Sequence, residues 1–205
     1  MMMNKRMGLG MVVCVLLVAL VLPLQAAEHA RPAAKSKVTW VHPVIANYGG
    51  VHPRPDVDMQ PDPGADYKVF VDVLSTGKDP TKVLGSLQRL ARLVNLMGYA
   101  KVPPGHVHIV ALLDEKAGMA ALTDTAYARM MAKYDPRHAK KGMKNPNLPL
   151  LHALKKAGVK LMICSQAMAG GGIKDSEIDP SVTITLSALT DPVIYGHRGY
   201  TYMQL

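Results

Sequence analysis

The segment Val159-Lys160-Leu161-Met162-Ile163-Cys164 decides the fold prediction for this chain of 205 residues. It is short and almost continuously apolar, which is typical of a strand buried on both faces of a parallel sheet. A helical pattern that ends at Gly158 precedes it, and a polar, glycine-rich stretch over 165–172 follows it. This order of helix, buried strand and loop predicts one unit of an α/β fold.

The same alternation runs through the chain from about residue 67 onward. Strands are predicted over 68–74, 106–113, 159–163, 182–186 and 200–204, and helices over 81–97, 123–131, 147–158 and 187–195, with Thr123 and Ser187 as N-caps. Strands that alternate with helices form a parallel sheet covered on both faces. The prediction is therefore a three-layer α/β/α fold with a mainly parallel sheet of about five strands, preceded by a proline-rich extended arm.

Residues 1–26 have the layout of a secretory signal peptide. Lys5 and Arg6 supply the positive charge, residues 11–22 form an unbroken apolar run, and a cleavage site follows near Ala26. We expect a periplasmic or secreted protein after cleavage. The alternative is an uncleaved segment that anchors the protein in the inner membrane, because the apolar stretch over 7–24 approaches the roughly 20 residues of a bilayer span.

Residues 27–64 are predicted to form the extended arm. Prolines at 32, 43, 53, 55, 61 and 63 remove backbone donors and favour extended backbone. Trp40, Ile45 and Val51 make the segment too apolar for a free linker. We expect the arm to lie across the domain formed by residues 65–205, or across a neighbouring subunit.

The formal net charge is +9, and removal of Lys5 and Arg6 would leave +7. Part of this charge is predicted to lie in one loop that contains Lys133, Arg137, Lys140, Lys141 and Lys144. Such a loop either holds an anion or an acidic partner, or is simply solvated. Aromatic residues are few and are not interleaved with the basic ones, so no nucleic-acid partner is expected.

Cys164 is the candidate reactive residue. The only other cysteine, Cys14, lies in the predicted signal peptide, so the mature protein would carry one thiol. A lone thiol outside the cytoplasm is either buried and inert or exposed and chemically used. Ligand sites of parallel sheets form at the carboxyl ends of the strands. That edge is predicted to hold Ser75, Thr76, Asp114, Glu115, residues 164–166 and residues 187–190.

Other chemistries find little support in the sequence. His106-x-His108 resembles a ligand pair, but it is predicted at the amino end of its strand, and no histidine or cysteine spacing matches a metal motif. No glycine-rich dinucleotide motif, phosphate-binding loop or Gly-x-Ser-x-Gly motif occurs. We therefore expect neither a metal nor a cofactor.

Several short motifs follow one another in order through the C-terminal third. They are Asn145-Pro146-Asn147, Leu150-Leu151 with Leu154, Lys156-Ala157-Gly158-Val159, Cys164-Ser165-Gln166, Ile178-Asp179-Pro180, Leu186-Ser187-Ala188-Leu189-Thr190 and Gly199-Tyr200. In this order they resemble the DsrE/DsrF-like family of sulfur-relay proteins. Residues 67–72 resemble the first strand of that family, and residues 47–51 in the arm resemble its exported branch.

The resemblance implies a three-layer α/β/α fold and assembly into dimers, trimers or hexamers. It also implies that Cys164 occupies a family cysteine position and carries sulfur as a persulfide. The candidate substrate-binding residues are Ser165, Gln166, Ser187 and Thr190. In this reading the backbone N–H groups near Gln166 stabilise the sulfur anion, and Ser187 or Thr190 supplies a further hydrogen bond. The partner would be a thiol-bearing protein or a small sulfur anion such as thiosulfate.

Two functional readings remain open from the sequence. In the first, the protein is a periplasmic sulfur carrier or a sulfurtransferase-like protein that uses Cys164. In the second, it is a non-catalytic binding or assembly protein of the same fold, with Cys164 buried and the arm tying subunits together.

Overall fold

Five parallel strands form one sheet at the centre of the fold. They are β1 (Tyr67–Val73), β2 (Val107–Leu113), β3 (Lys160–Cys164), β4 (Val182–Thr185) and β5 (Thr201–Gln204). Their order across the sheet is β4-β3-β2-β1-β5, and every neighbouring pair is parallel. The predicted mainly parallel sheet of about five strands is confirmed, and the structure shows that it is entirely parallel.

The structure, a computed structural model, describes residues 38–205 apart from positions 75, 76 and 78. The predicted signal peptide and residues 27–37 of the predicted arm lie outside the described residues. The chain from Val38 to Leu205 forms one compact unit.

The two faces of the sheet carry different side chains, because residues alternate along each strand. On β3, Leu161 and Ile163 point to the face that holds the larger core. Met162 points to the other face, where it packs with Phe70 of β1 and Leu112 of β2. Cys164 follows the alternation and belongs to the same face as Met162.

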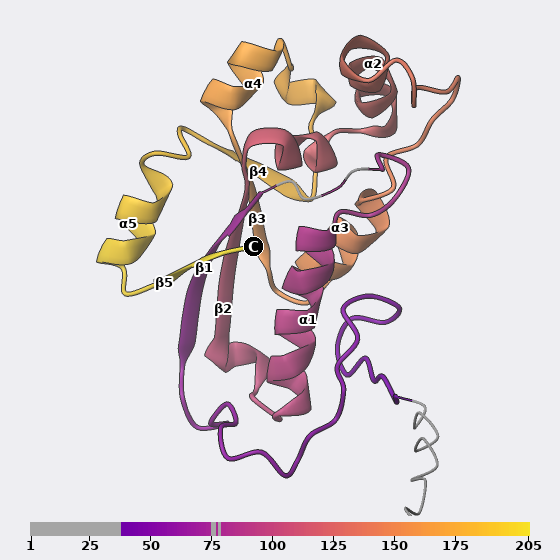
Figure 1. The fold of residues 1–205 in the computed structure, drawn as a ribbon. Helices are drawn as coiled ribbons and strands as arrows, with labels where there is room; N and C mark the ends of the chain where they lie inside the picture. The colour runs from indigo at the N-terminus through magenta and orange to yellow at the C-terminus, as the bar shows by residue number, and fades with distance from the viewer. Residues whose placement is uncertain (1–37, 75–76, 78) are drawn as a thin grey trace, which may run out of the picture. The chain divides into compact units, whose positions relative to one another are not determined.

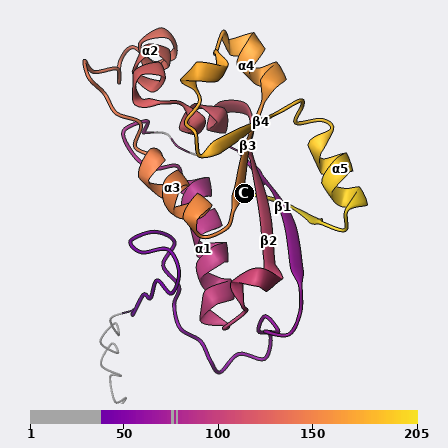
Figure 2. The ribbon, with the colours of Figure 1, turned by 180° about the vertical axis from the view of Figure 1, so that it is seen from behind.

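Helices cover both faces, which confirms the three-layer α/β/α prediction. Helices α1 (Gly85–Tyr99) and α3 (Leu148–Lys156) lie against the larger core, and α5 (Asp191–His197) covers the opposite face (Figures 1 and 2). Helices α2 (Asp124–Tyr134) and α4 (Ser165–Gly171) lie beyond the carboxyl ends of the strands (Figure 1). Short 3-10 turns occur at η1 (Pro104–His106), η2 (Glu115–Ala121) and η3 (Asp175–Glu177).

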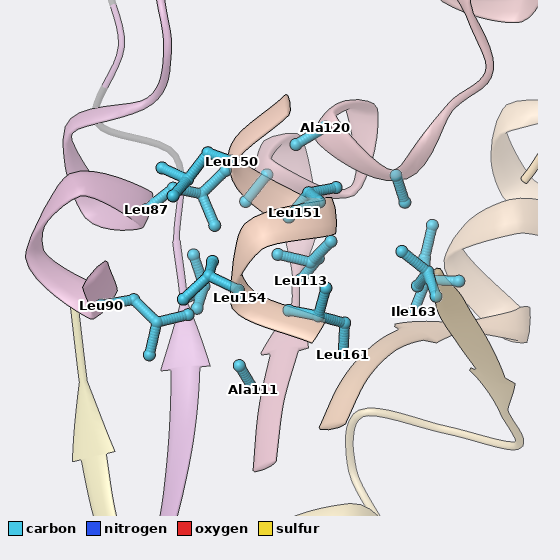
Figure 3. Close-up of a cluster of buried hydrophobic side chains, with 14 of the residues drawn as sticks. Leu87, Leu90, Ala111, Leu113, Ala120, Leu150, Leu151, Leu154, Leu161 and Ile163 are labelled. Carbon is cyan, nitrogen blue, oxygen red and sulfur yellow. The ribbon is translucent and has the colours of Figure 1, made fainter. Parts of the chain in front are cut away.

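Leucines of α1 and α3, two helices far apart in the sequence, form part of the larger core. Figure 3 shows Leu87 and Leu90 of α1 facing Leu150 and Leu154 of α3, with the strand residues beneath them. All four leucines are completely removed from solvent. Burial of a leucine side chain contributes roughly 1.5–3 kcal/mol, so this contact fixes both helices on the sheet.

The start of α1 differs from the prediction. The helix was expected from Thr81 but begins at Gly85, because the Asp79 carboxylate accepts hydrogen bonds from both the backbone N–H and the hydroxyl of Thr81, at 2.9 and 2.6 Å. A side chain that accepts from the backbone two residues later stabilises a turn in place of a helix. The backbone N–H of Leu84, just before the helix, donates to the Asn147 side chain at 2.9 Å.

The described part of the arm packs on α1 of its own chain. Asn95 of α1 is fully buried, and its Oδ1 accepts hydrogen bonds from the N–H groups of Val44 and Ile45 at 2.9 and 2.7 Å. Its Nδ2 donates to the carbonyls of Ile45, Tyr48 and Gly49. The side chain of Asn95 thus provides hydrogen-bond partners for several backbone groups of the arm. Buried polar groups need such partners.

Candidate functional site

Cys164 lies at the junction between β3 and α4. It is the last residue of β3 and the N-cap residue of α4, and Thr185, the last residue of β4, is its partner in the neighbouring strand. Only 4 % of the residue is exposed to solvent. The predicted position at the carboxyl edge of the sheet is therefore where the structure places it, on the face that α5 covers.

The sulfur of Cys164 has one hydrogen-bond donor in the described residues. The backbone N–H of Ala188 lies 3.3 Å from Sγ. Ala188 belongs to the turn between β4 and α5, so the donor comes from a segment 24 residues further along the chain. The sequence-based hypothesis named N–H groups near Gln166 as the donors, and the structure instead places the Ala188 amide at the sulfur.

Ser165 and Gln166 hold the turn that covers the cysteine. The Ser165 hydroxyl donates to the carbonyl oxygen of Leu186 at 2.8 Å. Gln166 Nε2 donates to the same carbonyl at 3.2 Å and to the Ser165 hydroxyl at 3.4 Å. These two side chains connect the start of α4 to the residue after β4, and thus hold the turn between β4 and α5 next to Cys164.

Ser187 and Thr190 make hydrogen bonds within the turn itself. The Ser187 hydroxyl accepts from the N–H of Leu189 at 3.2 Å, and the Thr190 hydroxyl donates to the Ser187 carbonyl at 3.1 Å. Ser187 is not the N-cap that the sequence pattern indicated, because the turn delays the start of α5 to Asp191, with Thr190 as the N-cap residue. The two hydroxyls shape the turn that carries the Ala188 amide to the sulfur.

Sequence reasoning missed a buried carboxylate next to this site. Asp191 is only 3 % exposed, and its Oδ1 accepts a hydrogen bond from the Thr185 hydroxyl at 2.7 Å. Its other oxygen, Oδ2, is buried and has no partner in the described residues. Thr185 is the strand neighbour of Cys164, so this acceptor belongs to the same corner of the sheet. The Asp191-Pro192 pair at a helix start was the available signal.

Comparison with known proteins decides the family. The DsrE/DsrF-like family matches residues 89–205, which is more than half of the chain and includes Cys164, the turn over it and α5. This chain belongs to the DsrE/DsrF-like family. Membership implies a protein of the sulfur-relay type, as the resemblance of the C-terminal motifs predicted.

This DsrE/DsrF-like chain is also similar to solved structures. A protein of unknown function from Methanobacterium thermoautotrophicum is similar over 68 % of this chain and 100 % of its own, with 14 % sequence identity and a TM-score of 0.45. Among curated proteins, no sequence matches the chain.

Of the other residues predicted at the carboxyl edge, the structure describes Asp114 and Glu115. Asp114 directly follows β2 and caps η2, where its side chain accepts from the N–H of Glu115 at 2.7 Å. Glu115 itself adopts a positive φ of 44°. Ser75 and Thr76, which were predicted to share this edge, lie outside the described residues.

The histidines of this DsrE/DsrF-like protein are dispersed. His106 lies in η1, before the strand rather than in it, with Nδ1 3.9 Å from Asp66, and His108 lies on β2. His152 pairs with Asp179 at 3.0 Å. Within the described residues, no three His, Cys, Asp or Glu side chains gather closely enough to hold a metal ion.

The five basic residues predicted for one loop are all exposed. Lys133 lies in α2 and packs over the ring of Tyr134 at 4.7 Å, so it is not part of the loop. Arg137 lies 4.0 Å from Asp135. In the part of the chain that the structure describes, no helix combines the length and the hydropathy needed to cross a membrane.

Proposed function

We propose that this DsrE/DsrF-like protein carries sulfur as a persulfide on Cys164. The observation that carries the proposal is the Ala188 N–H directed at Sγ from 3.3 Å, at the edge of the sheet where ligand sites form. A hydrogen bond from an N–H group stabilises an anionic acceptor more than a neutral one. The same amide can therefore support a thiolate, and a small shift of the turn would bring it to the outer sulfur of a persulfide.

Loading follows thiol exchange chemistry. The Cys164 thiolate attacks the outer sulfur of thiosulfate, a new S–S bond forms, and the S–S bond of the donor breaks with its electron pair leaving on sulfite. The product is the Cys164 persulfide anion. Delivery reverses the roles: a thiolate of the partner protein attacks the outer sulfur, and Cys164 leaves as a thiolate. Neither step needs an external oxidant or reductant.

Access to the sulfur requires the turn over Cys164 to move. Cys164 is 4 % exposed, and the hydrogen bonds of Ser165 and Gln166 to the Leu186 carbonyl hold the turn in place. These are two bonds at an exposed edge, and each contributes only about 1 kcal/mol. Transient opening therefore stays energetically accessible. The exposed basic residues over 137–144 supply a positive field that attracts an anionic donor.

The proposed compartment is the periplasm or the cell exterior, on the strength of the signal-like residues 1–26. Expression with the complete N-terminus in a Gram-negative host, followed by fractionation and mass measurement, tests this. The expected result is a periplasmic product that begins near Ala27. A membrane-bound product of full mass would support the anchored alternative instead.

The direct test of sulfur carriage is mass spectrometry of the intact mature protein after treatment with thiosulfate or polysulfide. The expected result is the addition of one sulfur atom, removed by a reducing thiol. Cys164→Ser should gain no sulfur, and Ser181→Ala, at the residue just before β4, should gain it as the wild type does. No added sulfur on the wild-type protein with either donor would refute the proposal.

The second candidate function is assembly without a covalent step, and the exposed apolar residues beside the site favour it. Leu186, Leu189 and Val193 are 70 %, 84 % and 71 % exposed on the turn and on α5. A second copy of the chain could cover them, in a dimer, trimer or hexamer. In that case Leu189→Asp should reduce the size on a sizing column, while Met59→Asp, at another exposed apolar residue, should not.

The rate of thiol alkylation separates the two functions. A carrier must expose Cys164 transiently in the folded protein, through movement of the turn, so iodoacetamide should modify it without denaturant. A scaffold with an inert cysteine should resist until the chain unfolds. Deletion of the arm is a poor test of assembly, because the described part of the arm packs on α1 of its own chain.

A further inference from the structure

A cavity of about 700 Å³ opens on the face of the sheet opposite Cys164. It lies at the carboxyl ends of the strands, between η2, α2 and α4. The most informative lining residues are Met119, Met130, Met131, Ile163, Ala167 and Met168. Its volume falls within the range of cavities that hold small molecules, about 300–1,000 Å³.

The strand β3 separates this cavity from the cysteine site. Ile163 lines the cavity and belongs to the larger core, whereas Cys164, the next residue, belongs to the face that α5 covers. Neighbouring residues of a strand point to opposite faces. The cavity is thus a site of its own, and its function goes beyond the proposed sulfur chemistry.

Four of the residues that line the cavity are methionines. Met130, Met131 and Met168 are at most 5 % exposed and also pack in the larger core. Methionine is flexible and polarisable, so a wall of this kind adapts to apolar ligands of different shapes. Ala167 on α4 leaves space at the same wall, because its side chain ends at Cβ.

Two of the four charged residues of the lining have partners within the protein. Asp79 accepts from the Thr81 hydroxyl at 2.6 Å and lies 3.3 Å from Lys82, and these contacts lower the pKa of Asp79 to about 2. Asp135 pairs with His138 at 2.8 Å. The other two, Glu115 and Lys116, are exposed neighbours of opposite charge.

The hydroxyl of Tyr127 also has a hydrogen-bond partner within the protein. Its hydroxyl donates to the carbonyl of Pro80 at 2.7 Å. Burial, together with the nearby Asp79 carboxylate, raises the pKa of Tyr127 to about 12, so the phenol stays neutral. The buried residues of the lining therefore offer apolar surface and thioethers to a ligand, and none of them carries a charge.

We propose that this cavity is a binding site for an uncharged, hydrophobic small molecule. A charged ligand would lose hydration on entry, and the buried residues of the lining carry no charge that could replace it. An uncharged apolar ligand gains by burial of its surface.

Fluorescence titration of the full mature protein with N-phenyl-1-naphthylamine, a neutral apolar probe, tests the proposal. The expected result is saturable binding of one probe per chain. Ala167→Phe should fill the cavity and weaken binding at least about tenfold. Ala169→Phe, at an exposed position of the same helix outside the lining, should bind the probe as the wild type does.

Two further results keep the test decisive. Cys164→Ser should bind the probe normally, which separates this site from the sulfur chemistry. The anionic probe anilinonaphthalene sulfonate should bind more weakly than the neutral one. Absence of saturable binding by the wild type, equal affinity of the Ala167→Phe variant with an unchanged circular dichroism spectrum, or tighter binding of the anion would each overturn the proposal.

Discussion

The backbone N–H of Ala188 donates a hydrogen bond to the Sγ of Cys164 over 3.3 Å, and so joins the end of β3 to the turn before α5. The turn both covers the sulfur and supplies its donor. Any chemistry at Cys164 therefore depends on how firmly this turn is held, and the holding groups are Ser165 and Gln166.

Replacement of Ser165 by alanine should loosen the turn. The variant loses the hydrogen bond from the Ser165 hydroxyl to the Leu186 carbonyl, a loss of about 1 kcal/mol, which should raise the alkylation rate of Cys164 about fivefold. The measurement is the rate of iodoacetamide modification of the native protein. Ser181→Ala serves as the control and should leave the rate unchanged. Equal rates for Ser165→Ala and the wild type would show that the turn does not control access.

Asn95→Ala should release the arm from α1. The substitution removes the acceptor for Val44 and Ile45 and leaves several backbone groups of the arm unsatisfied. We expect the free energy of unfolding to fall by about 3 kcal/mol. Urea denaturation gives this value, and limited proteolysis should cut the arm near residue 48 in the variant.

Gln88→Ala is the matched comparison for Asn95→Ala. Gln88 accepts a single hydrogen bond, from the N–H of Gly49 at 2.9 Å. Its loss should cost about 1 kcal/mol. If the free energy of unfolding fell by the same small amount in both variants, the hydrogen bonds of Asn95 would not be what holds the arm on α1.

Gly49→Ala should be among the most destabilising single-methyl changes in the arm. Gly49 has a positive φ of 59°, and an added Cβ would lie 2.2 Å from the backbone nitrogen of Arg92 in α1. Because that neighbour is helix backbone, it cannot move aside, and we expect a loss of at least about 3 kcal/mol. Gly105→Ala, where an added Cβ meets nothing within 4 Å, should change stability by less than about 0.5 kcal/mol. Thermal unfolding of both variants would check this, and equal melting temperatures would contradict it.

The Asp179 carboxylate should contribute stability that depends on pH. Burial alone would raise its pKa, but the hydrogen bonds from Ser181 and the pairing with His152 outweigh burial and lower the pKa. A lowered native pKa gives stability that is present above the ordinary aspartate pKa of about 4 and is lost as pH falls through the native value. Asp179→Asn should therefore be less stable than the wild type at neutral pH. The difference in the free energy of unfolding between the two proteins should become smaller below about pH 4.

Unfolding curves between pH 7 and pH 2.5 measure this difference. Asp58→Asn, at an exposed aspartate, controls for the loss of one negative charge. A gap between Asp179→Asn and the wild type that stays constant across the range would mean that the carboxylate charge does not contribute.

The strands and most helices could be predicted because their signals are local. Apolar runs marked β1, β2 and β3, and the Thr123 hydroxyl caps α2 as expected, accepting from the N–H of Ala126. The errors fall where a non-local or side-chain contact decides the boundary. Asp79 holds Thr81 in a turn and delays α1, and the turn at Ser187 delays α5.

The candidate site shows the same division. Cys164 could be found from its position after an apolar strand. Its donor could not, because the Ala188 amide carries no side-chain signal and lies 24 residues away. Asp191 could not be predicted for a related reason. Only the pairing of β3 with β4 places Thr185 beside Cys164, and Thr185 binds the Asp191 carboxylate.

The sequence by itself determined the α/β architecture, the single thiol after residue 26 and the family resemblance, since periodicity, composition and motif order can be read along the chain. Only the tertiary structure decided which groups surround that thiol, on which helix the arm lies and that a methionine-lined cavity opens behind Ile163. These features depend on contacts between segments tens of residues apart, and such contacts form only when the sheet brings its strands into register.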